Sequence, residues 1–533
     1  MTRERLYLFD TTLRDGAQTV GIDFSLDDKL LVASALDKLG VDYVEGGYPG
    51  ANRTDTELFA RPLPFENATF TAFGMTKRSG RSISNDPGFQ GVLAAECGAI
   101  CLVAKSWDYH VRVALGISNE ENLAAIAESV KAIVGTGREA MIDCEHFFDG
   151  YKGNRDYALA CVKAAIDAGA RWVVLCDTNG GSLPHEVEEI VGEVCKLAPG
   201  GRIGIHTHND TENAVANSLA AVRAGARQIQ GTINGIGERC GNANLTSIIP
   251  TLMLKSEFAD RFETGVTPDG LRTLTHASRM LDELLNRAPD RHAPYVGESA
   301  FATKAGIHAS AILKDPATYE HVPPEAVGNR RRVLVSDQAG RSNVLAELDR
   351  IGIPVQKDDP RLNGLLDEVK RREATGYAYD GADASFELLA RRKLSNVPRY
   401  FEVDSFRVLV ERRHNALGEL VTVSEATVKV HVDGETMMSV GEGNGPVNAL
   451  DTALRKDLGR YQEFISDLEL VDYKVRILTG GTDATTRVLI ESRDGGGNRW
   501  YTVGVSPNIV DASFEALLDS INYKLMRDGA PAP

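Results

Sequence analysis

The first 260 residues alternate between short apolar runs and amphipathic helical stretches, and this alternation is the strongest constraint on the fold. Each run has the length and composition of a buried strand, and little but a helical stretch separates it from the next. The runs are 6–10, 42–46, 69–73, 99–103, 140–144, 172–176, 202–206 and 228–232. Strand–helix units repeated over about 250 residues predict a (β/α)8 barrel.

A doubly wound open sheet is the alternative arrangement of the same elements. That fold commonly binds a dinucleotide at a glycine-rich turn after its first strand, and residues 10–16 read DTTLRDG, which lacks this fingerprint. In the barrel, the polar segments that follow the strands all lie on one face, where barrel enzymes carry their catalytic residues. The barrel is therefore the favoured prediction.

Three helices between the strands have recognisable start signals. Ser25 is placed to cap a helix over 26–39, and Asn119 to cap one over 120–134, because short polar side chains accept hydrogen bonds from the first free N–H groups of a helix. Pro184 marks the start of a third helix, where its missing N–H removes no hydrogen bond.

The chain has 533 residues, which is more than one hydrophobic core ordinarily contains, so several domains are expected. We predict a catalytic (β/α)8 barrel at 1–264, a linker with small helical subdomains at 265–400, and an α+β regulatory domain at 401–533. The linker contains helical stretches separated by polar loops, at 270–287, 361–372 and 383–391.

The C-terminal region contains an internal repeat, in which residues 440–458 recur as 503–521. The matched positions of the first copy are Val440, Gly441, Val447, Ala449, Ala453 and Leu454. Three strand-like runs precede each copy, so the pattern predicts a βββα unit that occurs twice and packs into one pseudo-symmetric domain. Because this region has no cluster of catalytic residue types, we interpret it as a ligand-sensing or dimerising domain; a purely structural cap is the alternative.

The bulk composition argues against several classes of partner. The formal net charge of −16 disfavours nucleic acid or an anionic membrane surface as the main partner. No stretch is apolar enough to span a bilayer, and the N-terminal residues lack the layout of a signal peptide. All seven cysteines lie between Cys97 and Cys240, at spacings that predict no disulfide framework. We therefore expect a cytoplasmic protein that acts on small molecules.

The segment HTHND at 206–210 is predicted to bind a metal ion. His206 and His208 are two residues apart at a strand end, so both imidazoles point to the same face. Asp15 follows the first strand and Asn242 the eighth, on the same face of the predicted barrel. Two nitrogen and two oxygen donors suit Mg²⁺, Mn²⁺ or Zn²⁺, with positions left open for substrate oxygens. Asp210 is expected to hold one imidazole tautomer.

Other strands on this face are followed by further polar residues. Arg14 precedes Asp15, and a guanidinium beside a metal can polarise a carbonyl and stabilise the alkoxide formed from it. Glu145, after the fifth strand, should point toward the same centre, and the Thr178 hydroxyl after the sixth could hold a carboxylate. Each has a structural alternative, such as a salt bridge for Arg14 or a turn cap for Thr178.

His308 lies beyond the barrel and is a candidate base, because an imidazole accepts a proton near neutral pH. Tyr319 follows eleven residues later, too far for one helical face, so a loop must return it to His308 if the two act together. The residues alone leave this pair a hypothesis.

Three segments together resemble the signatures of the isopropylmalate synthase and homocitrate synthase family: DTTLRDG (10–16), HTHND (206–210) and NGIGERCGN (234–242). These are metal-dependent barrel enzymes that carry out Claisen condensations. The resemblance covers essentially the whole chain, including the linker and the C-terminal repeat. Longer strings, such as AKSWDYHV (104–111) and DCEHFFDGYKGN (143–154), resemble the branch of the family that uses pyruvate.

The resemblance implies an acyltransferase that condenses acetyl-CoA with pyruvate and hydrolyses the thioester, in the first step of a threonine-independent route to isoleucine. It implies Mg²⁺ or Mn²⁺, with Zn²⁺ as a third choice, and assigns as metal ligands Asp15, His206, His208 and Asn242. It also implies isoleucine as a feedback inhibitor that binds the C-terminal domain, and a homodimer.

The resemblance further assigns roles around the substrates. Arg14 would contact the keto oxygen, Thr178 the pyruvate carboxylate, and Glu145 would orient the reacting groups. His308 with Tyr319 would activate the acetyl-CoA methyl group, and we expect this pair to come from the linker of a neighbouring subunit because it lies outside the barrel.

Other functions remain open at this stage. A 2-isopropylmalate synthase would use 2-ketoisovalerate in a larger keto-acid pocket, for leucine synthesis. A homocitrate synthase is disfavoured, since no additional basic residue for a second carboxylate is evident. A lyase or aldolase would share the metal motif without needing the C-terminal repeat, and a catalytically inactive amino-acid sensor would not need the intact metal set and Arg14.

Overall fold

The computed structural model describes residues 3–198, 200–334, 340–395, 397–414, 416–479 and 484–533. They form two compact units: residues 1–301 with 321–331, and residues 302–320 with 332–533. The finer division at residues 264 and 400 stays a prediction.

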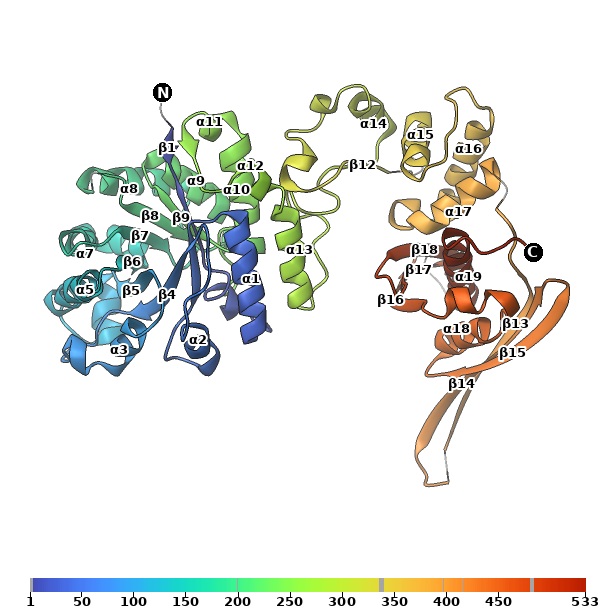
Figure 1. Cartoon of the computed structure of the whole chain (residues 1–533), viewed down its shortest axis with the longest axis horizontal. Helices are drawn as coiled ribbons and strands as arrows, with labels where there is room; N and C mark the ends of the chain where they lie inside the picture. Colours follow the sequence, from blue (N-terminus) through green and yellow to red (C-terminus); the bar gives the residue numbers. More distant parts are fainter. Residues whose placement is uncertain (1–2, 199, 335–339, 396, 415, 480–483) are drawn as a thin grey trace. The chain divides into compact units, whose positions relative to one another are not determined.

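The first unit is built on a closed barrel of eight parallel strands, in which β9 pairs with β2 (Figure 1). The strands are β2 (Tyr7–Asp10), β3 (Tyr43–Gly47), β4 (Thr69–Met75), β5 (Ala99–Lys105), β6 (Glu139–Glu145), β7 (Trp172–Asp177), β8 (Ile203–Thr207) and β9 (Gln228–Gly231). Closure confirms the predicted (β/α)8 barrel and excludes the open sheet, whose edges would stay unpaired.

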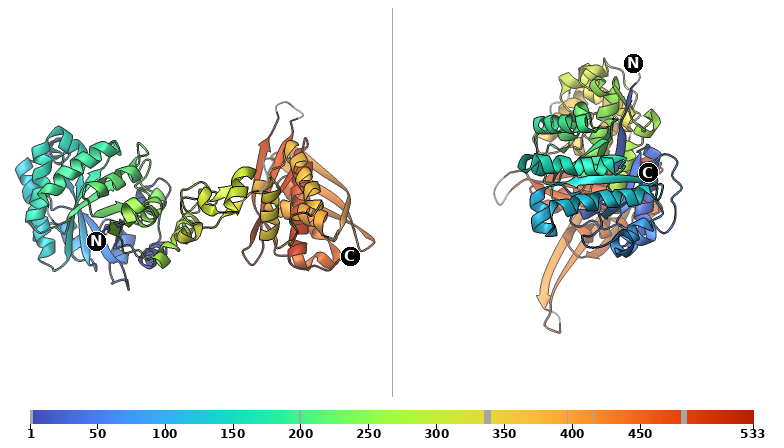
Figure 2. Two further views of the ribbon diagram at one scale, coloured as in Figure 1. Left: turned by 90° about the horizontal axis from the view of Figure 1, so that it is seen from above. Right: turned by 90° about the vertical axis from the view of Figure 1, so that its left-hand side faces the viewer.

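Helices follow each strand and cover the outside of the barrel (Figures 1 and 2). They are α1 (Leu26–Leu39), α2 (Arg53–Leu58), α3 (Pro87–Leu93), α4 (Asp108–His110), α5 (Asn119–Val134), α6 (Phe147–Gly153), α7 (Arg155–Asp167), α8 (Pro184–Leu197), α9 (Ala214–Ala224) and α10 (Leu245–Leu254). A π-helical turn, Val111–Leu115, follows α4. After the barrel come α11 (Ser256–Ala259), β10 (Phe262–Glu263), which pairs with β1 (Glu4–Arg5), and α12 (Pro268–Leu271) and α13 (Leu274–Leu284).

The predicted helix starts are confirmed at α1 and α8 and wrong at α5. Ser25 accepts a hydrogen bond from Asp28 N in a capping box, as expected. Asn119 is the first helical residue of α5, and Ser118 caps the helix by accepting from Glu121 N. Serine and asparagine are similarly good caps, so the glutamate three residues after Ser118, which completes the capping box, decides the register.

The barrel interior is packed rather than hollow. Phe9, Met141 and Trp172 are fully buried in its lower layers. The Trp172 indole donates to Tyr43 Oη at 3.1 Å, and Tyr43 donates to Glu139 at 2.8 Å. The polar side chains that form the candidate site lie toward the carboxyl ends of the strands, above these layers.

The second unit begins with a short parallel pair, β11 (Ala302–Thr303) and β12 (Arg332–Val333). Its helices before the repeat are α14 (Gly306–Ile312), α15 (Arg341–Arg350), α16 (Arg361–Ala374) and α17 (Asp383–Leu394). Helices α15 to α17 share a hydrophobic cluster that includes Leu348, Leu365 and Phe386.

The predicted βββα repeat is confirmed. Two antiparallel three-stranded sheets are each followed by a helix (Figure 1). The first copy is β13 (Glu402–His414), β14 (Leu420–Val432), β15 (Glu435–Gly443) and α18 (Pro446–Lys456); the second is β16 (Glu469–Ile477), β17 (Thr486–Arg493), β18 (Arg499–Ser506) and α19 (Ile509–Arg527). Both copies contribute to one hydrophobic core, which explains why the repeat forms a single domain.

The matched glycines and alanines of the repeat mark where strand and helix approach closely. A Cβ on Gly504 in β18 would lie 2.0 Å from Ala512 O in α19. A Cβ on Gly441 in β15 would lie 2.7 Å from Ala449 O in α18. Both distances are shorter than van der Waals contact, so only glycine allows this packing in either copy.

The edge strand β18 is joined to α17 by side chains. Tyr501 N donates to Asp383 Oδ1 at 3.2 Å, and Val503 N donates to Ser385 Oγ at 3.0 Å. Because an edge strand otherwise leaves its N–H groups open, these bonds fix the linker helix on the repeat domain.

No helix in the described part of the chain combines the length and apolarity needed to cross a membrane. All seven cysteines are unpaired, as their spacing predicted.

We predict that Gly504→Ala destabilises the repeat domain by about 1–3 kcal/mol, because the added methyl overpacks the contact between β18 and α19. Differential scanning calorimetry of the full chain should show the unfolding transition of the repeat domain at a lower temperature than in the wild type. Gly364→Ala, in α16 with no atom near the added Cβ, is the matched control and should be neutral or slightly stabilising. Equal transitions for the two variants would contradict the close-packing argument.

Candidate active site

Asp15, His206 and His208 meet at the carboxyl end of the barrel and form a group suited to a metal ion. His206 Nε2 lies 3.1 Å from Asp15 Oδ2, and His208 Nε2 lies 3.8 Å from the same oxygen. One ligand atom from each residue lies within 4.8 Å of the other two, and all three side chains are buried. The loop after β2 supplies Asp15, and His206 and Thr207 end β8, with His208 just beyond.

Asn242 stands beside this group with a free oxygen. It forms an isolated β-bridge with His208, and its Nδ2 donates to Ile236 O at 3.2 Å. Its Oδ1 is buried and accepts no hydrogen bond from the described residues. A buried oxygen without a donor is costly, so this atom fits a metal ligand position.

Burial and mutual charge set the protonation of the group. Burial, followed by the nearby His206 ring, lowers the pKa of His208 to about 4, so the ring is neutral at neutral pH and can act as a ligand. Burial by itself raises the pKa of Asp15, but Arg14 and the two imidazoles outweigh it, and the net pKa is below the usual value. Asp15 is therefore an anionic ligand.

Gln230 orients His206. The His206 Nδ1 lies 2.8 Å from Gln230 Oε1, and Gln230 Nε2 donates to Asp143 Oδ1 at 3.0 Å. An amide oxygen can only accept, so Nδ1 carries a proton, and Nε2, which lies 3.1 Å from Asp15 Oδ2, is the nitrogen that would bind a metal ion. Asp210, which was expected to hold an imidazole, instead accepts from Arg239 Nε at 2.7 Å, and Arg239 extends to it from the 234–242 loop.

Arg14 is held from three sides. Its Nε donates to Glu45 Oε2 at 2.7 Å, and Glu45 Oε2 also accepts from Thr11 Oγ1 at 2.5 Å. The guanidinium carbon lies 4.1 Å from the centre of the Phe73 ring. Burial alone would lower the pKa of Arg14, but Glu45 and Asp15 raise it by more, so the group stays charged. One guanidinium edge faces the metal group, since Nη1 lies 3.5 Å from Asp15.

Glu145 and Thr178 lie on the same end of the barrel. Glu145, the last residue of β6, forms an ion pair with Lys105, the last residue of β5. Thr178 Oγ1 accepts a hydrogen bond from His146 N at 2.7 Å, which leaves its hydroxyl hydrogen available to donate. The Thr178 carbonyl accepts from Arg239 Nη2 at 2.7 Å, so the loop after β7 is joined to the 234–242 loop.

His308 and Tyr319 meet each other in the second unit. His308 lies on α14, and a short 3₁₀ turn at Pro316–Thr318 returns the chain so that the two rings lie 4.4 Å apart. Both side chains are exposed, as is Ile307. The structure therefore pairs the two residues, in a different unit from the metal group.

Sequence reasoning missed Glu45, Gln230 and Lys105. All three lie at or near strand ends, and Glu45 and Gln230 are buried polar residues on short apolar strands. The signal was available, since a polar residue at an inward position near the carboxyl end of a barrel strand is typical of a site.

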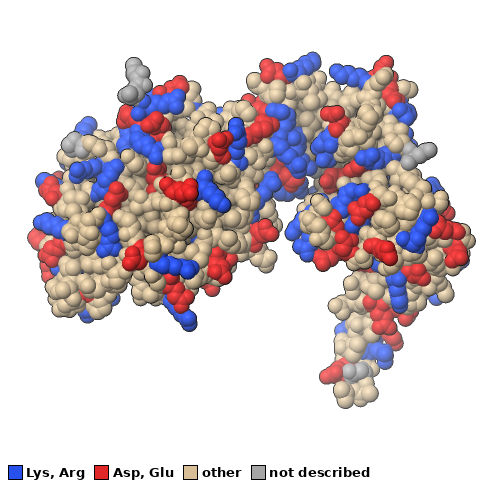
Figure 3. All heavy atoms as spheres, in the orientation of Figure 1, with Lys and Arg blue, Asp and Glu red and all other residues tan. Residues whose placement is uncertain are grey.

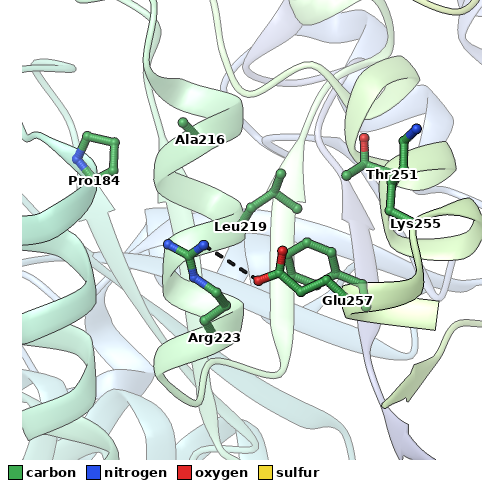
Figure 4. Close-up of a pocket in the computed structure, with 8 residues that line it drawn as sticks. Pro184, Ala216, Leu219, Arg223, Thr251, Lys255 and Glu257 are labelled. Carbon is green, nitrogen blue, oxygen red and sulfur yellow. Dashed lines mark ion pairs between the residues drawn. The ribbon is translucent and has the colours of Figure 1, made fainter. Parts of the chain in front are cut away.

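A groove on the outside of the barrel is a separate feature (Figure 4). It lies along α9, and Arg223 and Glu257 form an ion pair across it at 3.6 Å. Its lining residues are Pro184, Ala216, Leu219, Arg223, Thr251, Lys255, Glu257 and Phe258. None belongs to the metal group, so we place the chemistry at the barrel end instead.

Acidic and basic side chains are interspersed over the visible face of both units (Figure 3).

Three family descriptions match successive parts of the chain. Residues 5–272 match HMGL-like, residues 295–375 match the homocitrate synthase post-HMGL domain-like family, and residues 380–525 match the LeuA allosteric (dimerisation) domain.

Curated relatives match over nearly the full length. The chain is 49% identical over 529 residues to an (R)-citramalate synthase of Aquifex aeolicus, covering 98% of both chains. It is 49% identical over 524 residues to an (R)-citramalate synthase of Geobacter sulfurreducens, covering 97% of both. A probable 2-isopropylmalate synthase of Methanopyrus kandleri is 33% identical over 521 residues, 97% of this chain and 98% of that one.

We predict that Gln230→Met weakens Mn²⁺ binding about 10–100-fold, because His206 loses the acceptor that fixes its tautomer. Isothermal titration calorimetry on the metal-free protein measures this. Gln228→Met is the matched control: Gln228 is equally buried two residues earlier on β9, and among the described residues its side chain donates to Met141 Sδ rather than to a residue of the metal group. Equal Mn²⁺ affinities for the two variants would show that Gln230 does not support the site.

Proposed function

This chain belongs to the HMGL-like family and, within it, to the group of the (R)-citramalate synthases, and from this premise we propose that it condenses pyruvate with acetyl-CoA and hydrolyses the product thioester to (R)-citramalate and CoA. One molecule of water is consumed in the hydrolysis. Such a reaction begins a threonine-independent route to isoleucine.

The observation that carries the proposal is the buried Asp15–His206–His208 group with Arg14 beside it. Asn242, through its unpaired Oδ1, would be the fourth ligand. We propose Mg²⁺ or Mn²⁺, with Zn²⁺ less suited because an amide and a carboxylate oxygen favour harder ions. A bound divalent ion would supply Lewis-acid polarisation of the keto group.

The side chains around this group bind and orient pyruvate. Arg14 would donate to the keto oxygen and stabilise the negative charge that grows on it, the point at which binding lowers the barrier. Thr178 would donate its free hydroxyl hydrogen to the pyruvate carboxylate. Glu145, held by Lys105, would orient the reacting groups.

His308, with Tyr319 against its ring, would take a proton from the acetyl-CoA methyl group. The resulting enolate carbon attacks the keto carbon, and Arg14 is in place to stabilise the new alkoxide. The exposure of Ile307, His308 and Tyr319 supports a role in which α14 docks on another surface. We propose that this surface is the barrel of a second subunit, in a homodimer formed through the C-terminal domain.

The C-terminal domain would also be the regulatory site. Its match to an allosteric domain supports feedback control, and isoleucine is the effector that the proposed pathway calls for. The bonds from β18 to Asp383 and Ser385 join this domain to the helices that follow the His308 segment within one unit.

We predict that the protein releases free thiol from acetyl-CoA with pyruvate, that EDTA abolishes the release, and that Mg²⁺ or Mn²⁺ restores it. A panel of 2-keto acids with a thiol reagent measures this. Preference for 2-ketoisovalerate would indicate a 2-isopropylmalate synthase on the same metal group. Absence of release with every keto acid would contradict a condensing enzyme and favour a lyase or an inactive sensor.

We predict that mixed dimers of His308→Ala and Asp15→Asn chains recover about half of the wild-type activity, because one of the two sites then carries both intact groups. Differently tagged chains allow the mixed dimers to be isolated before assay. Each variant alone serves as the inactive control. Inactive mixed dimers would mean that His308 serves the barrel of its own chain.

A further inference from the structure

Lys29 is a buried cation that the proposed chemistry leaves unexplained. It lies on α1 with 4% of its surface exposed. Its Nζ donates to Leu13 O at 2.9 Å and to Gly46 O at 2.8 Å, and it pairs with Asp55 Oδ1 at 2.5 Å. These three partners use all three N–H groups of the ammonium.

The two carbonyls lie next to Arg14, which we propose contacts the keto oxygen, and next to Glu45, which holds Arg14. Leu13 immediately precedes Arg14, and Gly46 immediately follows Glu45. One ammonium therefore links the loop after β2 to β3, and each carbonyl lies one residue from a partner of the bond between Arg14 Nε and Glu45 Oε2.

Asp55 anchors the bridge on its far side. Its Oδ2 accepts from Tyr48 N at 2.9 Å and from Asn52 Nδ2 at 3.0 Å. Gly47 adopts φ +146°, and a Cβ there would lie 2.4 Å from the Asp55 carboxylate, so the last residue of β3 packs directly against this group. Both charges of the pair are thus fully committed and shielded from water.

A buried ion pair is a poor way to stabilise a fold, since desolvation can cancel the attraction. Its placement supports another role. We propose that Lys29 is a positioning residue that fixes the Leu13 and Gly46 carbonyls and thereby aims the Arg14 guanidinium at the keto acid. This inference rests on the proposed function of Arg14, and Lys29 itself touches no substrate.

The test uses the full-length chain and a double variant. Lys29→Met alone would leave Asp55 buried and unpaired, so Lys29→Met/Asp55→Asn removes both charges together. We expect kcat/KM for pyruvate to fall about 10²-fold, with a higher KM and a lower kcat, because a shift of about 1 Å in a substrate-positioning group has such an effect. The KM for acetyl-CoA and the Kd for Mn²⁺ should stay unchanged, since Asp15 is also held by Thr11 O.

Asp37→Asn is the matched control. Asp37 is a buried carboxylate on the same helix, and it accepts from Glu66 N, Asn67 N and Ala68 N rather than from the site loops. This variant should lower the melting temperature and leave kcat/KM for pyruvate unchanged. This control separates an effect on stability from an effect on the orientation of the Arg14 guanidinium.

Two outcomes would overturn the proposal: unchanged pyruvate kinetics in a folded double variant, or an equal loss of Mn²⁺ affinity, which would show general disorder of the site. The proposed function is tested separately by thiol release from the wild type. If the wild type releases none, the Kd of pyruvate for the Mn²⁺-loaded proteins still compares the double variant with the wild type, and equal Kd values would again overturn the role of Lys29.

Discussion

The arrangement of charged side chains at the carboxyl end of the barrel governs the rest of the site. Asp15, Glu45 and Asp143 bring three carboxyl groups into a space that contains one guanidinium, that of Arg14. Burial raises the pKa of Glu45, so this set is ionised as a whole only with further positive charge beside it. A divalent cation at the Asp15–His206–His208 group would balance it. The hydrogen bonds among Gln230, Asp143 and His206 leave little freedom for any other arrangement.

Supporting side chains also fix the proposed catalytic residues at the strand ends. Three of the residues that we assign to the chemistry are held by a neighbour to which we assign no substrate contact: Arg14 by Glu45, His206 by Gln230, and Glu145 by Lys105. Lys29 would hold two of the loops at once. Catalytic geometry must be kept within fractions of an ångström, and neighbouring strands of a closed barrel provide the rigid frame for this.

The C-terminal domain follows from a different constraint, the close packing of each helix on its sheet. Gly441 and Gly504 allow the approach, and small residues such as Ala449 and Ala512 meet them from the helix. The sequence repeat is therefore a repeat of contact points between strand and helix. The two copies differ in surroundings, because β18 of the second copy is joined to α17, which places the linker helices on that side.

The sequence by itself determined the elements, the barrel class, the twofold βββα unit and the Asp15–His206–His208 group, because these depend on local patterns: strand length, helix periodicity and residues that follow strands. It placed the start of α5 one residue late, since neighbouring Ser118 and Asn119 are both good caps. It marks Glu45, Gln230 and Lys105 as polar residues near strand ends but does not tell which side chain each one holds, and it identifies neither Lys29 as a supporting residue nor the ion pair of Arg239 with Asp210. These depend on which side chains from distant strands and helices meet, and only the closed barrel decides that.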